Sequence, residues 1–363
     1  MKKTITLILI NCIIISKSAF SQNRLSAIQE YVELQVRLNH FSGVILVANK
    51  EKIIYHKAFG YADREWNISN TLESKFEIAS LTKQFTAAAI LKLEEQHKLS
   101  LTDKLSKYFP NYPYGDQVTL HMLLSHTSGI ADYGASSKLS DLHRVALPKD
   151  SIIALLKTHP YQFTPGTKWS YSNYGYFLLG YIVEKVSKQS YEDYLNKYII
   201  KNISLQNTSF NRIDSVLAFR VKGYSSSEKD GWKNAEFISM EIVYSAGALI
   251  STAKDLYSWQ NALLDGKVVS KESLTKMTTS YLHNYGYGLG IDTFKNHRRI
   301  FHQGEIPGFT SFLGNFPNDK LSVVVLSNEG DDVTSMANAL SSIMLGLPFE
   351  VPGKKRATGM GVH

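Results

Sequence analysis

Apolar residues near the start of the chain change their spacing from helical to strand-like. Residues 24–38 carry apolar positions at helical intervals, and two apolar runs at 43–48 and 53–61 flank a polar turn at 49–52. Short apolar runs that are bounded by turn residues favour strands. The first segment therefore predicts an amphipathic helix, and the two runs predict a β-hairpin.

Strand-like runs return near the end of the chain. Residues 299–302, 310–316 and 321–327 read as strands, with a tight turn at 317–319 between the last two, and about 333–345 reads as a helix. Strands at both ends of the chain are most simply joined in one sheet.

The middle of the chain is patterned as helices separated by long loops. Helical stretches are expected at 152–156, 176–186 and 191–200, and a further helix is expected to begin at Ser80. The Ser80 helix has small residues in its interior, so we expect it to be central and buried. The predicted fold class is α/β (α+β), with a mainly antiparallel sheet flanked by helices and an inserted all-helical subdomain. The expected division is a sheet subdomain from about 22–95 and 246–345, a helical subdomain of about 96–245 and a C-terminal tail of 346–363.

The first 21 residues have the pattern of a secretory signal peptide. A positive start at Met1-Lys2-Lys3 precedes an apolar run over 5–15, and Ala19-Phe20-Ser21 offers small residues for cleavage after Ser21. The apolar run is shorter than the roughly 20 residues of a membrane-spanning helix. We therefore expect a periplasmic or secreted protein without a stable membrane span after cleavage.

Cysteine content and charge exclude several classes of function. The only cysteine, Cys12, lies inside the predicted signal, so the mature chain is expected to lack disulfides, cysteine nucleophiles and thiolate metal sites. The 363 residues carry a formal charge of +8, and the lysines and arginines are scattered among acids. This distribution argues against a nucleic-acid partner. No metal-ligand spacing of the H-E-x-x-H kind occurs, and we expect no metal or cofactor.

The candidate chemistry begins at Ser80-Leu81-Thr82-Lys83. Positions three apart share a helix face, so Lys83 can reach the Ser80 hydroxyl. A serine hydroxyl becomes a useful nucleophile when a neighbouring base removes its proton. A single S-x-x-K match is weak evidence, because both residues are common.

A second motif, Tyr171-Ser172-Asn173, follows a loop-forming stretch and leads into an apolar segment. A lysine ammonium nearby lowers the pKa of a tyrosine, which suggests Tyr171 as a base toward Ser80. The Asn173 amide both donates and accepts hydrogen bonds, so it can orient Lys83 and a substrate amide. Taken alone, the tripeptide is more typical of a turn with a packed ring.

A third motif, His302-Gln303-Gly304-Glu305, is expected where a strand ends at His302. Glycine after a strand lets the backbone approach a ligand closely. The N–H that follows Gly304 and the N–H of Ser80 can together form an oxyanion hole. An isolated histidine in this position is more often structural.

Together, S-x-x-K, Y-x-N and H-x-G in this order resemble the three motifs of serine β-lactamases and penicillin-binding proteins. The variant is similar to the class C β-lactamase, D-alanyl-D-alanine carboxypeptidase and family VIII esterase group. The likeness spans roughly residues 25–345, and its further matches are at 76–86, 123–130, 165–166 and 246–256.

The resemblance implies a mixed α/β domain beside a helical one, with the site in the groove between them. It implies that Ser80 is acylated, that Lys83 is its proton partner and that Tyr171 is the base. Asn173 would position the substrate together with His302, Gln303, Gly304 and Glu305. His126, in the stretch 123–130, is expected to be structural.

Two departures from the family pattern bear on the substrate. His302 stands where most class C β-lactamases have lysine, and Gln303 replaces a hydroxyl residue. Histidine is about half-titrated near pH 6.5, so it attracts a carboxylate less strongly than lysine does. The expected function is an acyl-Ser80 hydrolase acting on a β-lactam, a D-amino-acid peptide or a short ester, as a small-molecule or peptide substrate. The alternative is a non-hydrolytic penicillin-binding or sensor-type module.

Overall fold

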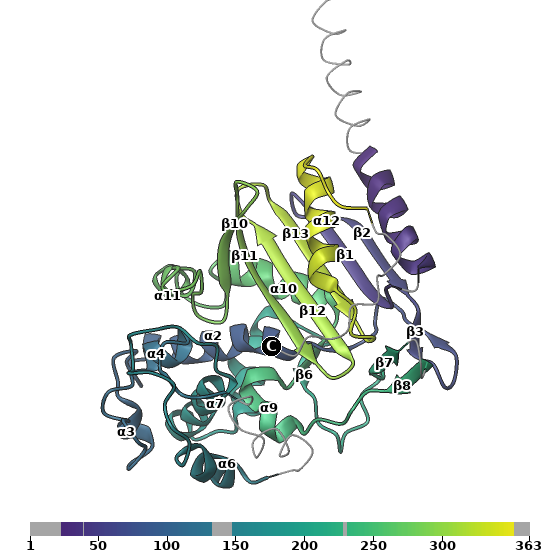
Figure 1. Ribbon diagram of the computed structural model, residues 1–363. Coiled ribbons are helices and arrows are strands. Elements are labelled where there is room, and N and C mark those ends of the chain that lie inside the picture. The colour runs from purple at the N-terminus through teal and green to yellow at the C-terminus, as the bar shows by residue number, and fades with distance from the viewer. Residues whose placement is uncertain (1–22, 39, 133–146, 228–230, 352–363) are drawn as a thin grey trace, which may run out of the picture.

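The computed structural model describes residues 23–38, 40–132, 147–227 and 231–351 (Figure 1). The predicted signal peptide and most of the predicted tail lie outside the described residues. The subdomain boundaries at 95/96 and 245/246 stay a prediction.

A six-stranded antiparallel sheet joins the two ends of the chain. Its strand order is β10-β11-β12-β13-β1-β2, and each neighbouring pair is antiparallel. The predicted hairpin is therefore confirmed as β1 and β2, and β13 covers the predicted range 321–327. The strands are β1 Gly43–Asn49, β2 Lys52–Phe59, β10 Gly290–Phe294, β11 His297–Ile306, β12 Phe309–Phe316 and β13 Leu321–Ser327.

The sheet is buried on both faces, so its central strands are almost continuously apolar rather than alternating. Successive side chains of β1 point to opposite faces. Val44 and Leu46 therefore join one core, and Ile45 and Val47 join the other. This explains why the strands could be predicted from their apolar runs. The face of the sheet that each residue occupies could not be predicted in the same way.

Helices cover both faces of the sheet. The helix of residues 23–37 and α12 (Val333–Leu345) pack on one face (Figure 1). The other face carries α2 (Thr82–Glu95) and α10 (Ala253–Leu264), whose Phe85 and Trp259 rings stack at 3.8 Å. Residues 82–91 of α2 are all buried, as expected for a central helix with small side chains.

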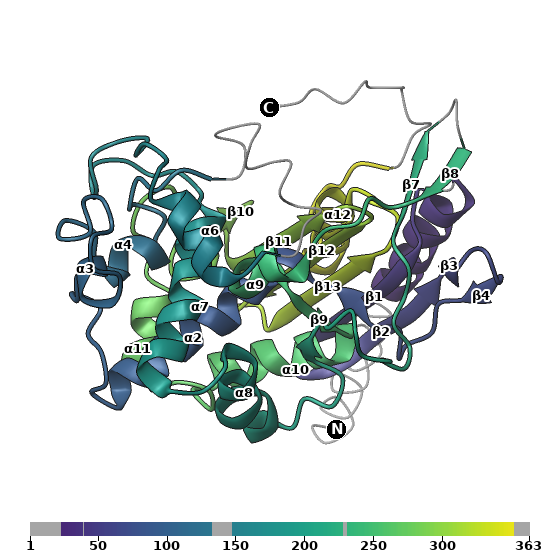
Figure 2. The same cartoon turned by 90° about the horizontal axis from the view of Figure 1, so that it is seen from below.

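The region between the two parts of the sheet is mostly helical and packs against α2 (Figure 2). It is not all-helical, because short strands occur between residues 209 and 234, and this part of the prediction is corrected. The helices are α3 Leu105–Tyr108, α4 Leu120–Leu124, α6 Lys149–Leu156, α7 Asn173–Ser187, α8 Tyr191–Leu195, a π turn at Asn196–Ile200, a 3-10 turn at Lys201–Ile203 and α9 Met240–Gly247, and the strands are β6 Ser209–Phe210, β7 Tyr224–Ser227 and β8 Gly231–Asn234.

The remaining elements are short and connect these layers. The chain passes through a 3-10 turn directly before α2, at the point where β11, β12 and α9 meet. These elements are β3 Tyr61–Asp63, β4 Ile68–Ser69, β5 Phe76–Glu77, the 3-10 turn Ala79–Leu81, β9 Leu249–Ser251 and α11 Lys271–Met277.

Candidate active site

Ser80 lies in the 3-10 turn that joins β5 to α2 and is half-buried. The Ile78 N–H before it donates to Leu249 O at 3.0 Å, which ties the turn to β9. Ala79 has a positive φ of 47°. A non-glycine residue in this region stores strain that the surrounding structure must hold in place, and such strain concentrates at functional sites. The backbone thus presents Ser80 from a constrained turn.

Lys83 is fully buried, and its hydrogen-bond partners among the described residues are uncharged. Its Nζ donates to Ser80 Oγ at 3.1 Å, to Asn173 Oδ1 at 2.7 Å and to Ala246 O at 2.9 Å. Burial disfavours the ammonium form and lowers the pKa of Lys83 to about 7, although the carboxylate of Asp132 acts in the opposite direction. At neutral pH, a large fraction of Lys83 is therefore the free amine, which can accept a proton.

Asn173 is the first residue of α7 and is held by Asp132. Ser172 caps the helix by accepting the Gly175 N–H at 3.1 Å. The two carboxylate oxygens of Asp132 accept from the Asn173 N–H at 2.9 Å and from Asn173 Nδ2 at 3.0 Å. Because the Nδ2 group is engaged in this way, Asn173 Oδ1 is left facing Lys83.

Tyr171 places its hydroxyl within hydrogen-bonding reach of Ser80, and Lys83 Nζ lies 4.8 Å from the centre of its ring. Burial raises the pKa of Tyr171 above its ordinary value, and the negative charge of Asp132 raises it further. The prediction of a lowered pKa is wrong. The cost of burying a phenolate outweighs the hydrogen bond with Ser80, so Tyr171 keeps its proton at neutral pH.

His126 packs behind Tyr171, with ring centres 4.3 Å apart. Its Nδ1 accepts the Ser172 N–H at 3.1 Å. Burial holds the pKa of His126 well below its usual value, so the ring is neutral. These contacts support the backbone of the Tyr171 loop, in keeping with the expected structural role.

His302 lies in the middle of β11, whereas the sequence predicted that the strand ends there. Its Nδ1–H donates to Gln303 O at 2.6 Å, and its Nε2 accepts from the Tyr285 hydroxyl at 2.8 Å. Burial lowers the pKa of His302 to about 3, and the nearby Lys83 contributes in the same direction. The expectation of a half-titrated histidine is therefore wrong, and His302 is neutral.

The continued strand separates the other residues of the third motif. Gly304 faces the Ser80 turn so closely that a Cβ atom would lie 2.4 Å from Ile78 O and 3.0 Å from Ser80 N. Gln303 and Glu305 are exposed and project to the opposite face of β11, where Gln303 Oε1 accepts from Thr334 Oγ1 at 2.9 Å. Gln303 also lines a cavity beside Tyr171 and His302, so the predicted contacts of Gln303 and Glu305 with substrate stay a prediction.

A cavity of about 380 Å³ opens beside Tyr171 and His302. Trp169 and His283 stack at 4.3 Å on its wall, and Tyr285 and Phe301 add further aromatic surface. Of the described residues that line this cavity, none is a lysine or an arginine. The cavity therefore suits a neutral group better than a free carboxylate.

Sequence reasoning missed three components of this site. Asp132 follows the 123–130 stretch by two residues, and Ala246 opens the 246–256 stretch, so both were within reach of the recognised motifs. Tyr285 had no such signal, because only the folded chain brings it to His302.

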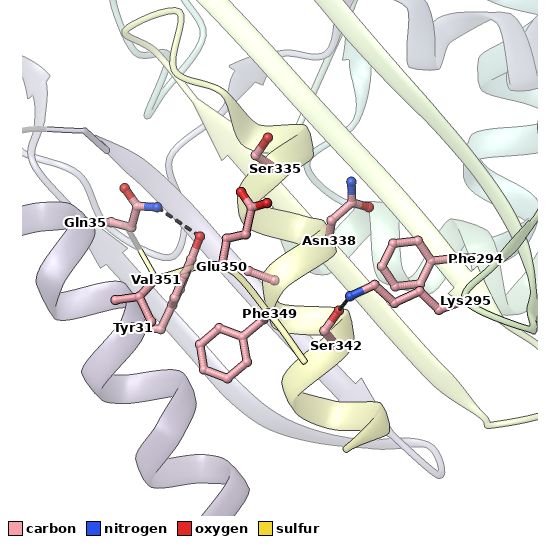
Figure 3. A pocket seen from close by; sticks show the side chains of 11 residues that line it. Tyr31, Gln35, Phe294, Lys295, Ser335, Asn338, Ser342, Phe349, Glu350 and Val351 are labelled. Carbon is pink, nitrogen blue, oxygen red and sulfur yellow. Dashed lines mark hydrogen bonds between the residues drawn. The ribbon is translucent and has the colours of Figure 1, made fainter. Parts of the chain in front are cut away.

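A second hollow of about 430 Å³ lies away from these residues, between the helix of residues 23–37 and α12 (Figure 3). There Lys295 Nζ donates to Ser342 Oγ at 3.2 Å, and Gln35 Nε2 donates to Tyr31 OH at 2.9 Å. None of the predicted site residues lines this hollow.

Metal and membrane features are also absent from the part of the chain that the structure describes. Within residues 23–38, 40–132, 147–227 and 231–351, no cluster of three or more histidine, cysteine, aspartate or glutamate side chains is arranged to hold a metal ion. In the same ranges, every helix is too short or too polar to cross a membrane.

Comparison with known proteins identifies the family. The model of the beta-lactamase family matches residues 27–345. The chain belongs to the beta-lactamase family. It is 29% identical to penicillin-binding protein 4* of Bacillus subtilis, over 94% of this chain and 82% of that protein.

Two solved structures agree with this membership. A penicillin-binding protein from Bacillus halodurans has a TM-score of 0.76 and 28% identity, covering 87% of this chain and 97% of that one. The octameric penicillin-binding protein homologue from Pyrococcus abyssi has a TM-score of 0.79 and 29% identity, covering 89% and 77%. The predicted family and fold class are confirmed, and the similarities support a serine hydrolase or acyltransferase.

Proposed function

We propose that this protein is a secreted or periplasmic hydrolase that cleaves an ester or amide through an acyl-Ser80 intermediate. The observation that carries the proposal is the fully buried Lys83, whose Nζ lies 3.1 Å from Ser80 Oγ and, within the described part of the chain, donates to neutral acceptors alone. A lysine whose pKa lies near the working pH is suited to general-base catalysis.

In the acylation step, the free amine of Lys83 takes the proton of Ser80 while Oγ attacks the substrate carbonyl carbon. The resulting oxyanion is held by the backbone N–H groups of Ser80 and Glu305, which the close approach of Gly304 to Ser80 N favours. Asn173 keeps the amine oriented and offers the substrate a polar contact.

Collapse of the tetrahedral intermediate expels the leaving group and forms the Ser80 ester. The protonated Tyr171 hydroxyl donates a proton to the leaving oxygen or nitrogen, and the Lys83 ammonium returns one to Tyr171. Water then attacks the ester by the same route in reverse, which regenerates Ser80. In this scheme Lys83 is the base and Tyr171 is the acid, the reverse of the assignment that the sequence suggested.

For the substrate, we infer a neutral acyl group and leaving group. The neutral His302 and the aromatic cavity support this choice, because neither provides a cation for a carboxylate. Short esters are therefore expected to turn over better than β-lactams or peptides that end in a free carboxylate.

Parallel kinetics with nitrophenyl butyrate, nitrocefin and a D-Ala-D-Ala peptide test this function. We expect steady ester turnover, weak nitrocefin turnover and loss of both in Ser80→Ala. Efficient nitrocefin hydrolysis would overturn the proposed substrate class, and activity retained in Ser80→Ala would overturn the mechanism. A single stoichiometric burst without turnover would instead indicate a non-hydrolytic binding module.

A further inference from the structure

The backbone of Tyr244 departs sharply from the helix that contains it. Its φ of 34° and ψ of −124° interrupt α9 two residues before Ala246, whose carbonyl accepts from Lys83. A bulky residue with positive φ is uncommon and persists only when its surroundings hold it.

Helix α7 packs closely against Tyr244 and Ser245. A Cβ atom at Gly180 would lie 2.1 Å from Ser245 Oγ and 2.9 Å from Tyr244 Cε1, so only glycine allows the contact. Ser245 Oγ also donates to Tyr176 O of the same helix at 2.8 Å. Gly180 and Glu184 are four residues apart and therefore share one face of α7.

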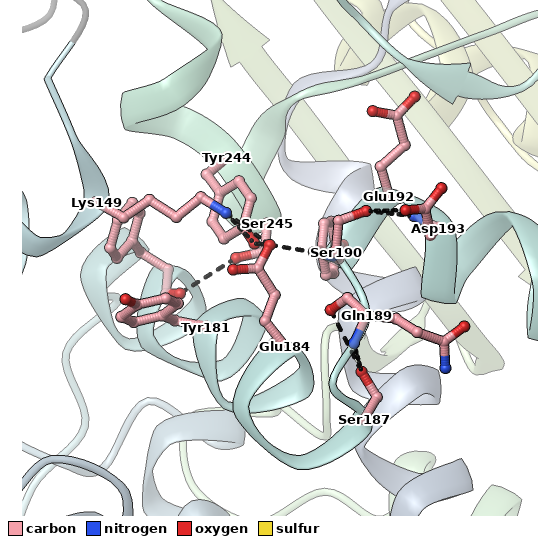
Figure 4. Close-up of polar contacts among 12 residues, drawn as sticks. Lys149, Tyr181, Glu184, Ser187, Gln189, Ser190, Glu192, Asp193, Tyr244 and Ser245 are labelled. Carbon is pink, nitrogen blue, oxygen red and sulfur yellow. Dashed lines mark hydrogen bonds and ion pairs between the residues drawn. The ribbon is translucent and has the colours of Figure 1, made fainter.

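Glu184 fixes the side chain of Tyr244 on that face (Figure 4). The Tyr244 hydroxyl donates to Glu184 Oε1 at 2.7 Å. The same oxygen accepts from the Tyr191 N–H at 3.0 Å and from Lys149 Nζ at 2.6 Å. The carboxylate is thus held by three donors from three separate parts of the chain.

After this change of direction, two successive backbone carbonyls accept hydrogen bonds from side chains of α2. Ser245 O accepts from Thr86 Oγ1 at 2.6 Å, and Ala246 O accepts from Lys83 Nζ at 2.9 Å. Lys83 and Thr86 are three residues apart on one face of α2. The network also closes on itself, because the hydroxyls of Thr86 and Tyr191 lie 2.6 Å apart.

We propose that Gly180, Glu184 and Tyr244, here called the Tyr244 anchor, are positioning residues that hold the Ala246 carbonyl against Lys83. The anchor does not touch the substrate. It acts through the orientation of the catalytic amine, so the inference rests on the function proposed above for Lys83.

The anchor also influences the protonation of Lys83. Among the residues that the structure describes, the titratable groups that face this amine are Asp132, Tyr171, His126, Tyr176 and His302. Among these, Asp132 favours the ammonium, and the other four are neutral rings near pH 7. The Ala246 carbonyl favours the ammonium as well, because it accepts a hydrogen bond from it. If the anchor is released, the pKa of Lys83 falls further, and the acidic limb of the pH–rate profile moves to lower pH.

Tyr244→Phe removes only the hydroxyl, which donates to Glu184 and accepts from Lys149 Nζ at 3.2 Å. We expect kcat to fall about 10-fold or more, since small displacements of a catalytic group are costly, with KM nearly unchanged. We also expect the acidic limb of kcat/KM to move down by about half a pH unit. Rates are normalised to the fraction of Ser80 that a fluorophosphonate probe titrates, which removes any effect of misfolded protein.

Tyr181→Phe is the matched control. Tyr181 lies on α7 beside Glu184, and its hydroxyl donates to the carboxylate of Asp150 at 2.6 Å, outside the anchor. This variant is expected to keep the kcat, KM and pH profile of the parent protein. A loss of kcat equal to that of Tyr244→Phe would overturn the proposal.

Glu184→Gln and Glu184→Ala provide a second test if Tyr244→Phe folds poorly. Glutamine keeps an oxygen acceptor for Tyr244, so we expect Glu184→Gln to retain several-fold more kcat than Glu184→Ala. Equal rates per titrated site in these variants and the parent, with unshifted acidic limbs, would show that the anchor is merely structural. That result would leave the acyl-Ser80 mechanism intact, whereas a failure of the parent protein to be labelled at Ser80 would remove the mechanism itself.

Discussion

Two lysines that contact α7 have opposite surroundings. Lys83 is fully buried and donates to a hydroxyl, an amide oxygen and a backbone carbonyl. Lys149 is one-third exposed and binds the carboxylate of Glu184 at 2.6 Å. Among the described residues, Lys83 therefore bonds to uncharged groups, whereas Lys149 bonds to a carboxylate.

The difference shows how the same helix can build a reactive amine and a structural ion pair. A carboxylate does lie near Lys83, but both oxygens of Asp132 are bonded to Asn173, so they bias the amine only from a distance. Desolvation then outweighs the attraction and brings the pKa of Lys83 to about 7. Direct contact with a carboxylate would have stabilised the ammonium and removed the base.

Replacing each lysine by methionine gives the largest contrast. Lys83→Met is expected to lower kcat/KM by about 10³- to 10⁴-fold, because the general base is lost. Lys149→Met should keep most of the activity, since Tyr244 and Tyr191 still bind Glu184. Ester kinetics on both variants check this prediction, and comparable losses in the two would erase the distinction between them.

Tyr171→Phe sharpens the assignment of acid and base. We expect kcat/KM to fall about 100-fold, because the proton donor to the leaving group is lost. The acidic limb near pH 7 should remain, since it belongs to Lys83 and not to the tyrosine. A pH–rate profile of the variant checks this; disappearance of the limb would restore Tyr171 as the base.

Asp132→Asn tests how far the distant carboxylate supports the ammonium of Lys83. Asp132 raises the pKa of Lys83, so its removal should move the acidic limb of kcat/KM to lower pH, by roughly half to one unit. The plateau rate should fall about threefold to tenfold, because Asn173 loses the carboxylate that accepts its two hydrogen bonds. A limb that moves to higher pH would contradict this electrostatic assignment.

The smallest expected effect is the stability change in Lys149→Met. A partly exposed ion pair contributes up to about 1 kcal/mol, so thermal unfolding should shift by only a few degrees. Differential scanning calorimetry at two salt concentrations checks it. A much larger loss would mean that Lys149 is needed to hold the whole Glu184 network.

Some elements of this fold could be predicted from the sequence because they depend on short segments of the chain. Residues 321–327 and 333–345 form β13 and α12 within the predicted bounds, and the spacing of Ser80 and Lys83 placed the amine beside the hydroxyl. Apolar period and helical spacing are properties of short segments.

The features that were predicted wrongly depend on contacts between segments that are distant in the sequence. The pKa of Tyr171 rises because tertiary packing buries its hydroxyl, and His302 is neutral because it is buried close to Lys83. The strand end predicted at His302 was wrong, because β11 continues to Ile306 through its pairing with β12.

The pH dependence of Ser80 labelling by a fluorophosphonate probe tests the central claim most directly. Intact mass and peptide mapping should place a single adduct on Ser80, and the rate of its formation should rise with pH through a midpoint near 7, where Lys83 becomes the free amine. No adduct on Ser80, or a labelling rate that does not change between pH 5 and 9, would contradict the account.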